Sequence, residues 1–498
     1  MLTSVAEGHS RLSLWLRVRE FAVPPSMIET ATARRSVGDW AGACAAAGFD
    51  VDLDLRSLTR THGRDLAAQL RADLRQLAPD LLRWHMPRIA PDGLLRPGLT
   101  LTLARYGAAG RPGPGPVHLV VRTPPAWADA GQRIALTLWG EDQHDSPWGC
   151  PAGHPHPRPQ QRFRLDLHRH LWDARRTGEL ALRSGADGCA AGGGPGLNPS
   201  AFGPRAPGSG VFVPGAPGPD ALDPVALDPD VRAALPPGQR CAVGRWAAEA
   251  GILLGSEGRS HGDFTVRLAA RRRLQLALVG APHGPALRLA ETSPQGSGTG
   301  PVPVLPDAAT WVLPDLDLIG AGAIEAGRLH PLVAAALAPG HEPPGADWNR
   351  NRADGTRVVE CRGERHRIAL VDGVLAPLDH PPAQVRQEEL LLALGGPPLP
   401  CLRAIDEAHR RPECLTGVRE RLDHGDIAGA LAVVEQLLGP EAVLRDGALK
   451  EELEVAARRR LDHGLYRTGL MGPGPGRIEP RRPRPRTSRA HPRHTHAR

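Results

Sequence analysis

Residues 64–103 read RDLAAQLRADLRQLAPDLLRWHMPRIAPDGLLRPGLTLTL and contain a change of hydrophobic period. The first half carries four leucines at helical spacing and predicts an amphipathic helix. The second half carries three leucines that alternate with threonine, so a strand with one polar face should follow the helix. The helical leucines are Leu66, Leu70, Leu74 and Leu77, and those of the strand are Leu99, Leu101 and Leu103.

The sequence on either side of this stretch indicates the same order of helices and then strands. Upstream, a helix should start after Pro25, and Gly38 followed by Asp39 should end one helix and cap the next. Downstream, further apolar runs joined by Gly/Pro turns predict an antiparallel sheet, with a closing helix around 171–183. The runs are VHLVVRT at 117–123, the alternating Ile134, Leu136 and Leu138, and the alternating Phe163, Leu165 and Leu167.

The second half of the chain predicts another mixed unit and then a run of helices. Helical patterns cover residues 239–254 and 322–338, and β-rich runs cover 264–279 and 285–290. HRIALVDGVLAPL (366–378) predicts a β-hairpin, because Asp-Gly is a strong signal for a two-residue turn. The helices expected after it lie near 383–394, 401–410, 415–423, 426–438 and 447–461.

The chain has 498 residues, which is too long for one ordinary core, and its 58 glycines and 52 prolines favour folded units joined by linkers. We predict the α+β class, with helical N- and C-terminal units, an antiparallel sheet between them and a disordered basic tail. The predicted units are an N-terminal helical unit (25–95), an antiparallel β unit with a closing helix (96–183), a Gly/Pro-rich linker (184–237), a mixed α+β unit (238–380), a C-terminal helical unit (381–470) and an Arg/Pro/His-rich tail (471–498).

The basic residues are almost all arginine, since Lys450 is the one lysine among 61 Lys and Arg residues. Any mechanism that needs a lysine must therefore use Lys450. AIDEAHRR (404–411) is similar to the DEAH box of helicases, but that chemistry also needs a GxxxxGK[ST] loop. Lys450 follows no glycine-rich loop and precedes Glu451, so we expect an ordinary helix at 404–411.

The net charge of +7 lies in the tail, where eight arginines and one glutamate occupy residues 471–498. The neutral remainder of the chain gives no overall electrostatic signature of nucleic-acid binding. The tail itself has two interpretations. It is either an arm that contacts nucleic acid or an anionic surface through charge, or a low-complexity end without function.

The seven cysteines are widely spread, odd in number and without a CxxC pair, which is typical of reduced thiols in a cytosolic protein. No apolar run approaches the roughly 18 residues of a membrane span. The first residues also lack the continuous apolar stretch of a secretory signal. We therefore expect a cytoplasmic protein with no membrane span.

Histidine and cysteine gather at residues 144–170, which is the candidate metal site of the sequence. If RLDLHRHLW (164–172) is a strand, His168 and His170 lie on one face and can ligate one ion. Cys150 or the loop residue His154 could complete a zinc tetrahedron. The spacing matches no standard zinc module, and imidazoles beside a polar loop are common without metal. Zinc is the one cofactor suggested, and we assign no catalytic or organic-cofactor residues.

Two resemblances add to these patterns. GDIAGALAVVEQLLGP (425–440) is similar to the second helix of a tetratricopeptide-type repeat, although the 34-residue period of such arrays is absent. The chain also resembles a family of uncharacterised actinobacterial proteins, in four stretches that lie outside the linker and the tail. These are GDWAGACAAAGFDVDLDL, LAPDLLRWHMPR, LDLHRHLWDARRTGEL and CLRAIDEAHRRPECLTGVRERLDHGDIAGALAVVEQLLG. The second resemblance implies a bacterial, cytosolic setting and no assigned activity.

Two functions remain open at this point. The first is a non-catalytic protein-interaction or scaffold protein that uses its helical hairpins to bind an unidentified protein partner. The near absence of lysine and of intact catalytic motifs favours it. The alternative is a zinc-type metal-binding enzyme or sensor built on the cluster at 144–170. The sequence leaves open whether the chain is an enzyme, and the lack of intact catalytic motifs favours a protein without catalytic activity.

Overall fold

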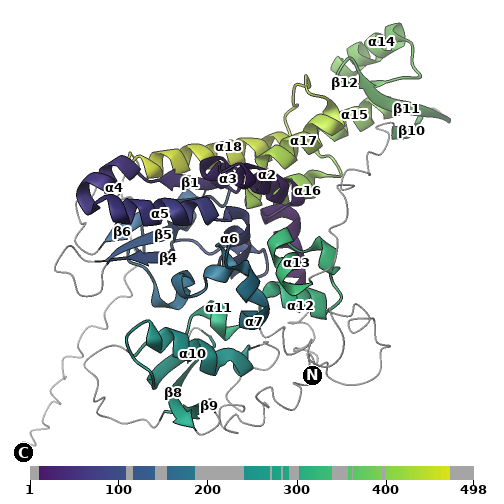
Figure 1. Cartoon of the computed structure of the whole chain (residues 1–498). Coiled ribbons are helices and arrows are strands. Elements are labelled where there is room, and N and C mark those ends of the chain that lie inside the picture. The colour runs from purple at the N-terminus through teal and green to yellow at the C-terminus, as the bar shows by residue number, and fades with distance from the viewer. Residues whose placement is uncertain are drawn as a thin grey trace, which may run out of the picture.

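The computed structural model describes residues 11–107, 116–129, 131–140, 154–184, 241–269, 272–281, 284–290, 302–338, 357–361, 363–394 and 399–470. The predicted linker, apart from Ser184, and the predicted tail lie outside these residues. The α+β class is confirmed, because helices and several antiparallel sheets share the chain (Figure 1). No helix in the described ranges is both long enough and apolar enough to cross a membrane.

The N-terminal part is helical, as the leucine spacing predicts. Its helices are α2 (Pro25–Ser36), α3 (Trp40–Ala46), α4 (Leu55–His62), α5 (Arg64–Gln76) and α6 (Pro79–His85), preceded by the π-helical turn η1 (Val18–Ala22). Asp39 caps α3 by accepting a hydrogen bond from the Gly42 backbone N–H at 2.8 Å. The predicted apolar face of α5 is buried through Leu70 and Leu74.

The central sheet has the order β1-β6-β5-β4. Its strands are β1 (Phe49–Asp52), β4 (Thr100–Tyr106), β5 (Val117–Arg122) and β6 (Ile134–Gly140). The pairs β4–β5 and β5–β6 are antiparallel, as expected, whereas β1 joins the edge of β6 in parallel. A two-stranded ribbon, β2 (Arg88–Ile89) and β3 (Leu94–Leu95), follows α6.

The strand expected at 163–167, and with it the strand reading of 164–172, is wrong. Three short 3-10 helices occupy this segment: η3 (Gln161–Phe163), η4 (Leu165–Leu167) and η5 (Arg169–Leu171). Most side chains from Phe163 to Asp173 are buried, so the burial of this segment follows neither a two-residue nor a three-residue period. The alternation of Phe163, Leu165 and Leu167 is therefore no sign of a strand with one polar face.

The next region covers the central unit with helices and adds a second, smaller core. Its elements are η6 (Thr177–Glu179), α7 (Leu180–Ser184), η9 (Val243–Arg245), α10 (Trp246–Gly255), β7 (Gly262–Arg267), β8 (Arg273–Ala281), β9 (Gly284–Leu289), α11 (Asp307–Thr310), α12 (Pro314–Gly320), η10 (Ala326–Arg328) and α13 (Pro331–Leu337). The sheet β7-β8-β9 is antiparallel and packs with α10 around Trp246 and Phe264. The main core contains buried residues of the N-terminal helices, the central sheet and α12–α13, from Leu14 to Leu180 and from Leu313 to Leu337.

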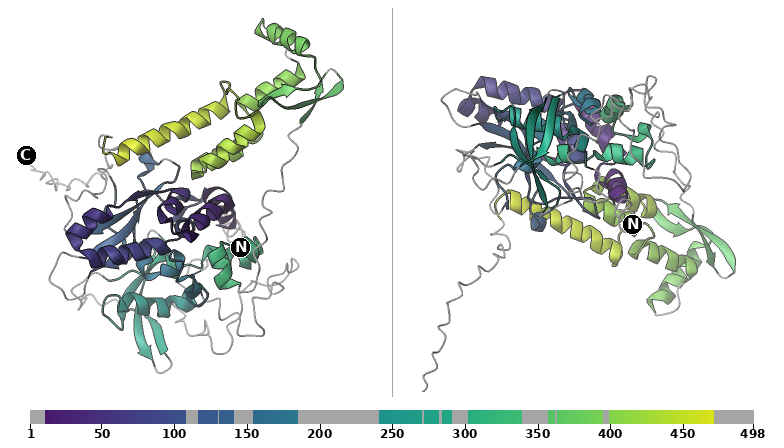
Figure 2. Two further views of the ribbon diagram at one scale, coloured as in Figure 1. Left: turned by 45° about the horizontal axis from the view of Figure 1, so that its top comes forward. Right: turned by 90° about the horizontal axis from the view of Figure 1, so that it is seen from below.

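The C-terminal region begins with the predicted hairpin and continues as helices. Its elements are β10 (Arg357–Cys361), β11 (Glu364–Val371), β12 (Val374–Pro377), α14 (Pro382–Ala393), α15 (Pro400–Arg410), α16 (Leu415–His424), α17 (Ile427–Leu438) and α18 (Ala448–Arg467). Strands β10–β12 with α14 and α15 form a small lobe that projects from the rest of the protein (Figures 1 and 2). Helix α18 runs back from this end across the main body.

Candidate metal centre

Four potential metal ligands meet in the small lobe of β10–β12, α14 and α15, which we therefore call the metal lobe. They are Cys361 at the end of β10, His366 on β11, His380 just before α14, and Cys401 on the first turn of α15. One side-chain donor atom from each residue lies within 4.8 Å of the corresponding atoms of the other three. Both cysteines are fully buried and His380 is almost so, while His366 is partly exposed. The four donors therefore converge on one enclosed point.

The strand register explains why the first two ligands meet. Val359 of β10 pairs with His366 of β11 in the antiparallel ladder, and cross-strand partners share a face. Cys361 lies two residues beyond Val359, so its side chain is on that face as well. The left-handed turn at Asp372 (φ 50°) and Gly373 (φ 78°) then sends β12 back along β11. His380 follows directly after this return strand.

Helix α15 supplies the fourth ligand and closes the lobe. Pro400 occupies the first helical turn, where its missing N–H costs nothing, and Cys401 follows it. Leu402 and Ile405 of the same helix pack with Ile368 of β11 in one small core. That core contains six buried residues, and two of them are the cysteines of the site: Cys361, Ile368, Leu399, Cys401, Leu402 and Ile405.

The two histidine rings of the cluster face each other. His366 Nδ1 and His380 Nε2 lie 2.7 Å apart. The other nitrogen of His380 is 3.4 Å from Gln384 Oε1, and that of His366 is 3.5 Å from Glu364 Oε2. An acceptor behind a metal-binding imidazole helps to hold the ring in place, and Gln384 occupies this position behind His380. Two imidazole nitrogens on one tetrahedral zinc lie about 3.3 Å apart, so the rings need only a small outward shift.

The Cys401 thiol is neutral when no metal is bound. Burial and, to a smaller extent, a hydrogen bond with the adjacent Cys361 together raise the pKa of Cys401 to about 11. All five cysteines in the described ranges, including these two, are free thiols. A metal that binds here must displace the thiol protons, as it does in thiolate sites generally.

The donor set fits zinc. Two sulfur and two nitrogen donors in a four-coordinate arrangement are a structural zinc set, because tetrahedral S₂N₂ geometry suits this ion. All four positions are taken by protein, which leaves none for a substrate or a reactive water. The arrangement can therefore hold an ion and stiffen the lobe, whereas an exposed catalytic ion would need an open position.

Sequence reasoning missed this site because its ligands are far apart along the chain. The spacing is C-x4-H-x13-H-x20-C, and no two ligands form the CxxC or HxxxH pairs that mark familiar zinc modules. One signal was present, however. His366 and His380 lie at nearly equal separations on either side of the predicted Asp372-Gly373 turn, so a folded hairpin brings them together.

The histidines of the predicted site have other partners. His168 is buried, with Nδ1 3.1 Å from the Arg164 carbonyl and Nε2 3.1 Å from Glu249 Oε2. The ring of His170 lies 5.8 Å from that of His168, and burial lowers the pKa of His170. His154 Nε2 instead contacts the Thr123 carbonyl at 3.1 Å.

The structure thus brings His168 and His170 side by side, but on 3-10 helices rather than on a strand. Among the described residues, three or more donors lie close enough to share an ion in the cluster around Cys361, and the histidines at 154–170 do not form such a group. Cys150 lies outside the described residues, so its part in a metal site with His154, His168 and His170 stays a prediction.

Comparisons with protein-family models, with curated proteins and with solved structures gave no match to this chain. The assignment of the site therefore depends on its own geometry. Three observations support this assignment: the convergence of four donor atoms, the burial of the two thiols, and the Gln384 acceptor behind His380.

Proposed function

We propose that this chain is a zinc-binding protein in which Cys361, His366, His380 and Cys401 hold one structural ion. The observation that carries the proposal is the convergence of four donor atoms within 4.8 Å of one another. The ion would close the metal lobe and take no part in chemistry, because the protein occupies every position of a tetrahedral shell.

The size of the lobe supports this role. Its core holds six buried residues, too few for a stable hydrophobic core by itself. Structural zinc contributes about 10–16 kcal/mol of binding free energy in small zinc-dependent peptides, and this binding energy becomes folding energy. A bound ion would therefore supply the stability that the small apolar core lacks.

The second part of the proposal is that the protein binds a protein partner and has no catalytic activity. Lys450, the one lysine, is partly exposed on α18 and pairs with Asp446 at 2.7 Å, on the same surface as Glu454. An ammonium group held in such exposed i,i+4 pairs has neither the burial nor the depressed pKa of a reactive lysine. A closed zinc site and this lysine both favour a binding role. The bacterial cytosolic setting, and nucleic-acid binding by the tail, stay predictions.

Elemental analysis of the purified full-length protein tests the zinc assignment. We expect one zinc per chain, and we expect it to be lost from the double variant Cys361→Ser/Cys401→Ser. The control is Cys241→Ser, which changes a partly buried thiol outside the lobe and should keep its zinc.

Two results would reject the assignment. One is wild-type protein without stoichiometric zinc after purification in zinc-containing buffer. The other is zinc that persists in the double variant but disappears on Cys150→Ser, which would move the metal to the cluster at 144–170.

A further inference from the structure

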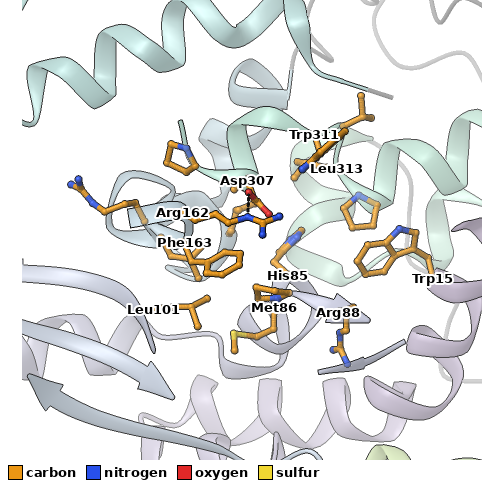
Figure 3. A pocket seen from close by; sticks show the side chains of 18 of the residues that line it. Trp15, His85, Met86, Arg88, Leu101, Arg162, Phe163, Asp307, Trp311 and Leu313 are labelled. Carbon is orange, nitrogen blue, oxygen red and sulfur yellow. Dashed lines mark hydrogen bonds and ion pairs between the residues drawn. The ribbon is translucent and has the colours of Figure 1, made fainter. Parts of the chain in front are cut away.

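A cavity of about 390 Å³ lies in the main body, away from the metal lobe. Four segments supply most of its walls: residues 11–15, residues 85–90 at and after the end of α6, the 3-10 helices at 161–171, and residues 306–314 (Figure 3). Its volume falls in the range of small-molecule sites. Most of the lining is apolar, and the large side chains are Trp15, Met86, Leu101, Phe163, Trp311 and Leu313.

Three polar atoms in this lining lack a partner. Trp15 Nε1, His85 Nε2 and Arg88 Nε are all buried, and none of them has a hydrogen-bond partner among the described residues. Burial lowers the pKa of His85 to about 4, so the ring is neutral at pH 7. Buried polar atoms without a partner cost free energy, and a ligand that offers an acceptor would remove that cost.

The charges of the lining leave one positive charge uncompensated. Four arginines line the cavity, and three of them pair with carboxylates: Arg162 with Asp307 at 2.6 Å, Arg164 with Asp166 at 2.8 Å, and Arg11 with Asp317 at 3.3 Å. The fourth, Arg88, donates to two backbone carbonyls, those of Arg83 at 2.6 Å and Gly93 at 3.1 Å. It forms no ion pair with a carboxylate in the described part of the chain.

Arg88 is therefore in an unusual environment. Burial lowers its pKa well below the ordinary value, and the neighbouring positive charge of Arg83 lowers it further. Arg83 does not line the cavity; it donates to three carbonyls and is stabilised by the nearby carboxylates of Asp129 and Asp426. Arg88 is therefore the arginine of the lining whose charge has no carboxylate partner in the described ranges, and such a charge favours the approach of an anion.

From these observations we propose that the cavity binds a small aromatic monocarboxylate. The flat apolar body would lie between the aromatic and aliphatic walls, and the carboxylate would balance the charge of Arg88 and accept from the Trp15 N–H. The His85 ring, seen beside the Arg162–Asp307 pair in Figure 3, offers a second hydrogen-bonding group. This site is separate from the metal lobe and does not rest on the proposed zinc function.

The test uses two compounds of the same shape, 2-naphthoate and its neutral amide, 2-naphthamide. Isothermal titration calorimetry with the full-length protein should show one saturable site for naphthoate. The amide should bind at least about tenfold more weakly, because it brings no charge to Arg88. Equal affinities, or no saturable binding of naphthoate up to millimolar concentration, would overturn the proposal.

A conservative variant locates the site. Trp15→Phe keeps an aromatic ring and removes the N–H, and it should weaken naphthoate binding several-fold. The matched control is Trp127→Phe, at a tryptophan that packs against Tyr466 and does not line this cavity. Unchanged binding in Trp15→Phe, or an equal loss in Trp127→Phe, would show that naphthoate binds elsewhere.

Discussion

At the scale of single residues, several histidines are buried as neutral rings, and His118 shows the reason clearly. It lies on β5, 7 % exposed, with its ring edge-on to Trp139 at a centroid distance of 5.1 Å. Burial lowers the pKa of His118 to about 4, and the nearby Arg105 adds to the effect. His154 and His424 are lowered in the same way, to about 4 and about 3.

This burial predicts a loss of stability in acid. A histidine whose pKa is lower in the folded state binds its proton preferentially after unfolding, so stability is complete above pH 6.5 and falls as the pH drops towards 4. His118 alone accounts for up to about 2 kcal/mol between pH 6.5 and pH 5. His118→Phe should therefore reduce the difference in unfolding free energy between pH 7 and pH 5 by about 1–2 kcal/mol, as measured by urea denaturation.

His261→Gln serves as the control for this experiment, because His261 is exposed and its replacement should leave the pH dependence unchanged. If His118→Phe retains the full acid sensitivity of the wild type, the ring of His118 is not held neutral by the fold.

At the scale of helices and strands, hydrophobic period predicted most of the regular structure. The helices expected at 401–410, 415–423 and 426–438 correspond to α15, α16 and α17, and the Asp372-Gly373 turn joins β11 and β12. The hydrophobic period could not distinguish a strand from the 3-10 helices at 161–171, because each of these helices is too short to show a period of its own. Strand β1 was also missed, because FDVD buries only Phe49 fully and its parallel pairing is long-range.

The metal site was missed for a related reason. Its four ligands come from two strands, a connecting loop and a helix, and only the strand register and the packing of α15 bring them together. Sequence motifs for metal sites have ligands that lie close together along the chain, and His168 and His170 were therefore predicted instead. In the structure these two rings lie together, yet one of them is engaged by Glu249.

The joint between α16 and α17 gives a prediction at this scale. Gly425 ends α16 in the left-handed region at φ +86°, and a Cβ there would meet the Gly131 carbonyl oxygen at 1.9 Å. Gly425→Ala should lower the free energy of unfolding by about 2–4 kcal/mol, through backbone strain and the displacement of the Gly131 turn.

Gly417→Ala is the matched control, since Gly417 lies inside the same helix with open space around its Cβ position. It should be neutral or stabilise by up to about 1 kcal/mol, because alanine favours a helix. Similar losses in both variants, measured by thermal and urea denaturation, would contradict the close approach of the two turns.

At the scale of the whole molecule, the C-terminal helices are tied to the main body in two places. The Arg83 guanidinium donates to the carbonyls of Ala22, Gln132 and His424, so one buried side chain links the N-terminal helices, the central unit and α16. At the far end of α18, His463 lies 3.2 Å from Asp50 Oδ2 on β1, and Arg467 pairs with the same carboxylate. The metal lobe projects beyond both ties (Figure 1).

The lobe meets the C-terminal helices through Ala408 of α15 and Leu375 of β12, and the packing around its ligands depends on its own small core and on the proposed ion. The cysteines that would bind the ion are also core residues, which couples metal binding to packing. Removal of zinc should open this lobe while the main body, held by Arg83 and α18, keeps its structure.

X-ray absorption at the zinc K-edge of the purified protein measures the coordination of the proposed ion. We expect two sulfurs at about 2.3 Å and two nitrogens at about 2.0–2.1 Å around zinc, and the loss of the sulfur contribution in Cys361→Ser/Cys401→Ser. A shell of nitrogen and oxygen alone in the wild-type protein, or a sulfur signal that survives in the double variant, would contradict this expectation.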